Sequence, residues 1–155
     1  LLGQNEASLT TMVNAYNSVS NEGSLYDNFI IKKITNRNGR TLYERKENNV
    51  KQELNKSVCR KLKSCLNGVI QGVNSDEATA YFVADAIKCN KNDINYGGKT
   101  GTTDNNADIW FIGYTPKFTM GLWQGYSNGN RKQDYVSGAS CANVWTKIIK
   151  KYNGK

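Results

Sequence analysis

A basic, glycine-rich strand followed closely by an aromatic strand is the feature that most restricts how this chain can fold. Residues 97–103 read Gly-Gly-Lys-Thr-Gly-Thr-Thr, and residues 108–116 read Asp-Ile-Trp-Phe-Ile-Gly-Tyr-Thr-Pro. The turn between them, Asp104-Asn105-Asn106, is short enough to predict antiparallel neighbours. A Lys-Thr-Gly strand supplies a fixed ammonium, a hydroxyl and a glycine that lets a bound carbonyl approach the backbone. These three groups suit an acyl-transfer site.

Further strands and turns complete the pattern of a sheet protein. Strands are predicted at Tyr96–Thr102, Ala107–Thr115 and Phe118–Tyr126. Two more β-rich runs, Phe29–Ile34 and Thr41–Glu44, flank Asn38-Gly39, a pair that readily adopts the positive φ values of a tight hairpin.

Helices are predicted where apolar residues recur at helical spacing. The first spans the apolar positions 9, 12, 13, 16 and 19, with Ser8 as N-cap and Gly23 just past its end. The second is expected from about Ser57 to Gln71, between a cap at Asn55 and a stop at Gly72.

Its apolar stripe consists of Val58, Leu62, Cys65, Leu66 and Val69. A shorter helix is expected within Asp76–Ile87, and Ser127–Asp134 is expected to be a polar loop. A terminal helix presents an apolar side made of Val144, Trp145, Ile148, Ile149 and Tyr152. Together these elements predict an α+β fold, an antiparallel sheet flanked by helices.

Composition excludes several classes of function. The 155 residues include no histidine, which rules out Ser-His-Asp and Cys-His catalysis. The net charge is +8, yet the lysines are scattered and collect on no single predicted face, so a solvated surface is favoured over nucleic-acid binding. Cys59 and Cys65 lie too far apart on a predicted helix to bond, while Cys89 and Cys141 could pair although nothing local indicates it.

A phosphate-binding loop at Gly98-Lys99-Thr100 is also excluded. That pattern requires a glycine five positions before Gly98, where this chain has Asp93, and a helix directly after the loop.

The run from Gly97 to Tyr126 closely resembles the third, fourth and fifth strands of the transpeptidase domain of penicillin-binding proteins, particularly the bifunctional peptidoglycan synthases. The shared motifs are Gly-Lys-Thr-Gly-Thr-Thr, the acidic residue before Trp-Phe-Ile-Gly-Tyr-Thr-Pro, and Trp123-Gln-Gly-Tyr126. Residues 8–23 also resemble the helix upstream of that sheet, so the resemblance spans nearly the whole chain.

Two motifs of this family are missing. The family nucleophile lies in Ser-x-x-Lys and its second motif is Ser-x-Asn, and no serine from Ser8 to Ser140 fits either pattern. We therefore expect residues 1–155 to form the C-terminal portion of a single transpeptidase domain. The upstream half of that domain is then an expected partner, and the isolated piece is expected to present an incomplete sheet edge and to self-associate.

The resemblance assigns roles to the motif strand. Lys99 supplies positive charge beside the substrate carboxylate, and the backbone N–H of Thr102 forms one half of the oxyanion hole. Thr100 and Thr102 project from the same side of an extended strand and can bind one ligand carboxylate. Gly101 allows close approach, and Thr103 is the remaining candidate for substrate binding. The resemblance implies no metal and no cofactor.

The implied function is D,D-transpeptidation of D-Ala-D-Ala stem peptides of peptidoglycan, with acylation by β-lactams. The implied place is the extracytoplasmic face of a bacterial cell membrane, with an anchor upstream of Leu1. Two alternatives stay open at this stage: a β-lactamase or β-lactam sensor relative, and a noncatalytic binding module with the same fold.

Overall fold

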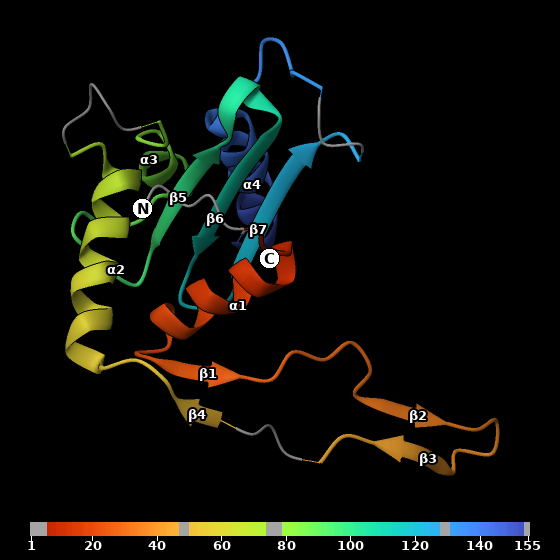
Figure 1. The fold of residues 1–155 in the computed structure, drawn as a ribbon. Helices are drawn as coiled ribbons and strands as arrows, with labels where there is room; N and C mark the ends of the chain where they lie inside the picture. Colours follow the sequence, from red (N-terminus) through yellow and green to blue (C-terminus); the bar gives the residue numbers. More distant parts are fainter. Residues whose placement is uncertain (1–5, 47–49, 74–78, 128–130, 154–155) are drawn as a thin grey trace.

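A three-stranded antiparallel sheet forms the centre of the molecule (Figure 1). The computed structural model describes residues 6–46, 50–73, 79–127 and 131–153. The strands are β5 (Gly97–Thr102), β6 (Asp108–Tyr114) and β7 (Thr119–Gly125), in the order β5-β6-β7. Each lies within one residue of its predicted bounds, and the predicted α+β class is confirmed. The turn between β5 and β6 is a short 3-10 helix, η1 (Asp104–Asn106).

Helices cover both faces of this sheet. On one face, α3 (Val83–Ile87) and α4 (Gly138–Asn153) enclose the core. There the rings of Phe111 on β6 and Trp145 on α4 pack edge to face, with their centroids 5.4 Å apart. On the other face lies α1 (Leu9–Ser20), seen in front of the sheet in Figure 1. It packs so closely that a Cβ on Gly121 of β7 would meet a methyl group of Val13 at 2.6 Å.

The second predicted helix forms as α2 (Lys56–Gln71), with the predicted caps. The Asn55 side chain accepts from the Ser57 N–H, and Gly72 takes the left-handed conformation at φ 72°. The predicted apolar stripe was right only in part. Val69 packs against the core and Leu66 is half-buried, but the fully buried face of α2 consists of Cys59, Lys63, Asn67 and Ile70. The two polar members are buried because they bind the chain segment before β5, and the predicted stripe residues Val58 and Leu62 are exposed.

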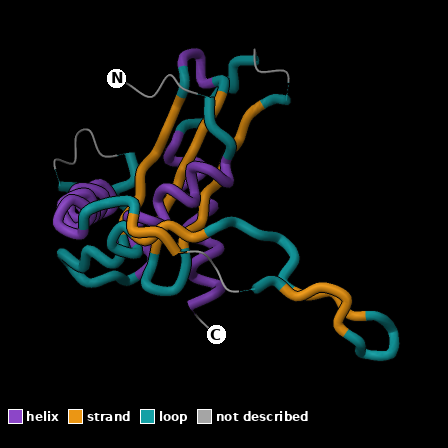
Figure 2. The backbone as a smooth tube through the Cα atoms, turned by 60° about the horizontal axis from the view of Figure 1, so that its bottom comes forward, coloured by secondary structure: helices purple, strands orange, loops and turns teal. Residues whose placement is uncertain are grey.

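Four short strands connect α1 to α2. The pair β1 (Ser24–Tyr26) and β4 (Val50–Gln52) lies next to the body, and the pair β2 (Lys33–Thr35) and β3 (Thr41–Glu44) lies further out. Figure 2 shows the outer pair extending away from the rest of the molecule. We call residues 27–46 the arm.

The hairpin at the end of the arm is confirmed, but its details differ from the prediction. The stretch Phe29–Lys32 is not a strand, and only Gly39 has a positive φ (78°), whereas Asn38 does not. The reason is a longer turn: the Asn36 side chain accepts hydrogen bonds from the N–H groups of Asn38 and Arg40. That arrangement requires a left-handed residue at Gly39 alone.

The remaining predictions have mixed outcomes. Of the helix expected within Asp76–Ile87, only Val83–Ile87 is helical, and residues 76–78 lie outside the described part. All four cysteines are free thiols, so Cys89 and Cys141 do not pair. Among the described helices, none is long and apolar enough to cross a membrane.

Candidate functional site

The motif strand β5 lies at one edge of the described sheet, with β6 on its other side. The register pairs Lys99 with Ile112, Thr100 with Phe111 and Thr102 with Ile109. Side chains alternate along a strand, so Thr100 and Thr102 project from one face of the sheet and Lys99 from the other.

The open edge of β5 carries backbone groups that β6 does not use. The Thr103 N–H donates to the Asp108 carbonyl of β6 at 3.0 Å. Successive residues of an antiparallel pair alternate between bonded and non-bonded positions, so the N–H and C=O groups of Thr100 and Thr102 point away from β6. At Thr100 and Thr102 the edge therefore presents two outward N–H groups and two outward carbonyls.

The Lys99 ammonium lies at this same edge. Its Nζ donates to the outward Thr100 carbonyl at 3.0 Å and approaches Thr100 Oγ1 at 3.5 Å. Lys99 is exposed and forms no ion pair within the described residues. A positive charge without a carboxylate partner thus stands beside an edge that can bind an extended ligand.

The two threonine hydroxyls on the opposite face differ in their surroundings. Thr100 is half-buried, its hydroxyl shares a hydrogen bond with that of Thr79, and Gly138 at the start of α4 lies against its side chain. Thr102 is exposed. Of the two, Thr102 is the hydroxyl that a ligand can reach without displacing a protein partner.

Thr103 lies in a different setting from the one expected for a substrate-binding residue. Its hydroxyl accepts from the Asp108 N–H at 2.8 Å, and Asp108 in turn accepts from the Trp123 indole N–H at 2.9 Å. These bonds join the end of β5 to β6 and β7. They favour a structural role for Thr103, in which it fixes the turn that follows Thr102.

The glycines of the motif are required by packing within the sheet. A Cβ on Gly97 would lie 2.5 Å from the Tyr114 hydroxyl, and one on Gly98 would lie 2.6 Å from the Phe111 ring. At Gly101 the nearest atom would be Trp110 Cβ at 3.3 Å. The absence of a side chain at Gly101 therefore lets β5 and β6 lie close together beside Trp110.

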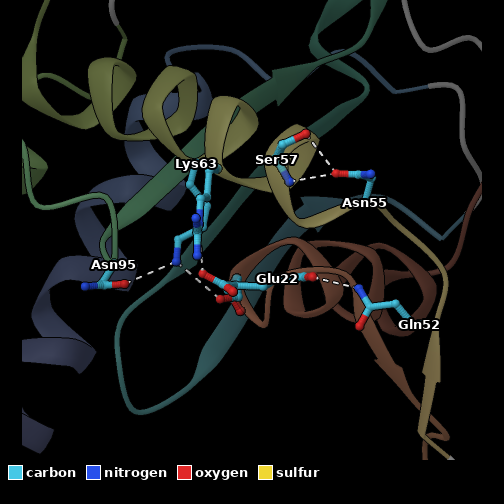
Figure 3. A network of polar contacts seen from close by, with 8 residues as sticks. Glu22, Gln52, Asn55, Ser57, Lys63 and Asn95 are labelled. Carbon is cyan, nitrogen blue, oxygen red and sulfur yellow. Dashed lines mark hydrogen bonds and ion pairs between the residues drawn. The ribbon is translucent and has the colours of Figure 1, made fainter.

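Buried side chains of α2 hold the segment that leads into β5. Asn67 donates to the carbonyls of Asp93 and Tyr96 at 2.9 and 3.0 Å. Lys63, only 5% exposed, donates to Asn95 Oδ1 at 3.1 Å and to the Ser20 carbonyl at 3.4 Å (Figure 3). The entry to the motif strand is therefore fixed to the middle of α2, and Lys63 also links it to the C-terminal end of α1.

The comparison with protein families identifies the chain. A model described as the penicillin-binding protein transpeptidase domain matches residues 2–150. The chain belongs to this transpeptidase family.

Relatives and solved structures agree with that assignment. The chain is 31% identical to penicillin-binding protein 1A of Rickettsia conorii over 81% of its length, and 33% identical to penicillin-binding protein 4 of Bacillus subtilis over 74%. It spans only 17% and 16% of those two relatives. The crystal structure of penicillin-binding protein 1A from Haemophilus influenzae matches with a TM-score of 0.79 and 20% identity, covering 94% of this chain and 26% of that one. This last likeness shows the transpeptidase fold.

Several supporting residues of this transpeptidase-family chain could not be singled out from sequence. Gln133 lies in the predicted polar loop, yet it is 7% exposed and donates to the carbonyls of Asn106, Ala107 and Gln124. Gly138 and Thr79 contact Thr100 from segments distant in sequence. No local pattern marks these residues, because each is defined by long-range contacts. Among the described residues, no group of three or more His, Cys, Asp or Glu side chains could hold a metal ion.

Proposed function

We propose that this chain forms the Lys-Thr-Gly wall of the active site of a serine-type D,D-transpeptidase that cross-links peptidoglycan. Residues 1–155 are then the C-terminal portion of one transpeptidase domain, and polypeptide preceding Leu1 supplies the nucleophilic serine. The observation that carries this proposal is the open edge of β5, where the Lys99 ammonium and the outward N–H of Thr102 lie on one strand.

The proposed chemistry assigns one task to each group. The serine oxygen bonds to the carbonyl carbon of the penultimate D-alanine, and the carbonyl oxygen becomes an oxyanion that accepts from the Thr102 N–H. The serine hydroxyl gives up its proton as this bond forms. The carbon–nitrogen bond then breaks, the carbonyl re-forms as a serine ester, and the proton passes to the amine of the released D-alanine. The Lys99 ammonium stabilises the negative charge of the substrate carboxylate and assists this proton transfer.

The terminal carboxylate of the substrate is bound on the threonine side of the strand. Thr102 offers an accessible hydroxyl, and Thr100 offers one after its bond to Thr79 opens. Thr103 is the remaining proposed member of the binding set, although its hydroxyl oxygen already accepts from the Asp108 N–H. The acyl group then passes to an amine of a neighbouring stem peptide, and a β-lactam acylates the same serine. This activity places the site on the extracytoplasmic face of the bacterial membrane.

The test compares two lysines in the polypeptide that includes the segment before Leu1. Removal of one preorganised electrostatic group lowers a rate by about 10²- to 10³-fold, so Lys99→Ala should slow acylation by a fluorescent penicillin by about that factor. Lys117→Ala is the matched control, because Lys117 is exposed in the turn between β6 and β7. Equal acylation rates for the two variants would remove Lys99 from the mechanism.

The isolated chain provides an independent test. It contains no Ser-x-x-Lys motif, so incubation with excess benzylpenicillin should leave its mass unchanged in intact mass spectrometry. A stable gain of one ligand mass, abolished by substitution of a single serine of this chain, would show that the nucleophile lies within these 155 residues.

A further inference from the structure

Within the part of the chain that the structure describes, β2 and β3 of the arm, residues 27–46, make their main contacts with each other. Figures 1 and 2, two views of the molecule, both show this strand pair extending away from the body. A two-stranded ribbon is marginally stable in water unless a further strand, a helix or another surface packs on it.

The side chains of the arm expose a large apolar surface. Ile30 is fully exposed and Leu42 is 64% exposed. Four more large apolar side chains of the arm are also exposed: Phe29, Ile31, Ile34 and Tyr43. Only Phe29 has a described cover, the Arg45 guanidinium 4.6 Å from its ring centre. Ile34 and Tyr43 are cross-strand partners and lie on one face of the ribbon. Exposed large apolar side chains concentrated on one arm in this way are typical of a site of interaction.

The arm is also basic. It contains six lysine and arginine residues against Asp27 and Glu44, a net charge of +4. The two acidic side chains pair with Arg45 and Lys33. Four cations have no ion pair within the described residues: Lys32, Arg37, Arg40 and Lys46. These charges repel the arm of a second copy and attract an acidic surface.

The relatives of this chain contain much sequence outside the matched region. The chain spans 17% and 16% of the two curated relatives named above. A covering segment within the same polypeptide would act at an effective concentration in the millimolar range, so a modest surface is enough to hold it.

We propose that the arm is a docking surface for another segment of the same polypeptide, one that presents an apolar strip flanked by acidic side chains. This proposal rests on the proposed function, in which the 155 residues are one part of a longer transpeptidase. A lipid bilayer fits the arm less well, because the tip, Asn36–Arg40, holds no apolar residue and the apolar side chains lie behind it. An apolar strip with acidic flanks would cover the exposed apolar side chains of the arm and would complement its net positive charge.

Hydrogen exchange read by mass spectrometry tests the proposal. Amides of residues 29–44 should exchange at least about tenfold more slowly in the longer polypeptide than in the 155-residue chain, because docking removes the open state. Equal exchange in the two proteins would overturn the proposal. Slow exchange that requires added phosphatidylglycerol vesicles would also overturn it and would identify a lipid partner.

Charge reversal provides the matched comparison. Arg37→Glu with Arg40→Glu should return arm exchange in the longer polypeptide to the rate of the isolated chain, whereas Lys150→Glu with Lys151→Glu changes the net charge equally on α4 and should leave it slow. Unchanged protection in the first variant would exclude an acidic partner segment. Exchange in β6 confirms that each variant is folded, and acylation of the same samples by a penicillin reports separately on the proposed function.

Discussion

The Tyr114 hydroxyl is a buried group through which alkaline pH acts on the fold. It donates toward the carbonyls of Ile94 and Lys63, at 3.2 and 3.4 Å, below the entry to β5. Burial raises the pKa of Tyr114 well above its ordinary value of 10.0, and Asp93 and Tyr16 raise it further. Because the folded pKa is the higher one, the stability from the neutral hydroxyl is fully present below about pH 10 and is lost as pH rises through the folded pKa.

Tyr114→Phe should therefore lower the free energy of unfolding by about 1 kcal/mol at pH 8, and this deficit should shrink as pH rises above 10. Urea unfolding at several pH values from 8 to about 11 measures it. Tyr81→Phe is the control, because the Tyr81 side chain is 58% exposed. This variant should show no loss of stability at any pH in the series. A Tyr114→Phe deficit that stays constant up to pH 11 would contradict the argument.

At the scale of elements, α2 determines where the motif strand begins. Asn67 is 4% exposed and donates both amide hydrogens to the segment 93–96 that leads into β5. Asn67→Ala should lower the free energy of unfolding by about 2 to 3 kcal/mol, because two buried carbonyls lose their donors. Asn143→Ala, at an exposed position on α4, should stay within about 0.5 kcal/mol of wild type. Urea unfolding of both variants is the measurement, and equal stabilities would show that water replaces the Asn67 amide.

The elements that sequence predicts well are those specified by local chemistry. Ser8, Asn55 and Gly72 cap their helices as predicted, and β5, β6 and β7 begin and end within a residue of their predicted bounds. The buried face of α2 could not be predicted, because the buried polar side chains Lys63 and Asn67 bind segments distant in sequence, chiefly one about 30 residues later. The same reason hides Gln133 and the contact of Thr79 with Thr100.

At the scale of the whole molecule, the first part of the apolar stripe of α2, Val58 and Leu62, faces solvent. Val58 is 48% exposed and Leu62 is 42% exposed, and Val73 and Tyr81 extend the apolar surface past the end of the helix at 60% and 58%. The open edge of β5 adds unpaired backbone groups at another site. The net charge of +8 opposes association, and the basic arm contributes half of that charge. The stripe on α2 is therefore the surface through which two copies are expected to meet.

We expect the isolated chain to self-associate through this stripe. Its weight-average molecular mass in sedimentation experiments should then rise with protein concentration. Leu62→Glu should shift association to concentrations higher by about tenfold or more, because it places a carboxylate in the apolar contact. Val144→Glu makes the same change in net charge at a 49% exposed position on α4. Comparison of the two variants therefore separates the effect of where the charge lies from the effect of net charge. Equal shifts for the two variants would place the contact elsewhere. A folded wild-type chain that stays strictly monomeric to high micromolar concentration would mean that these residues close their own core and that the exposed stripe needs no cover. That result would contradict the expectation that the sheet and its helices lack a covering partner.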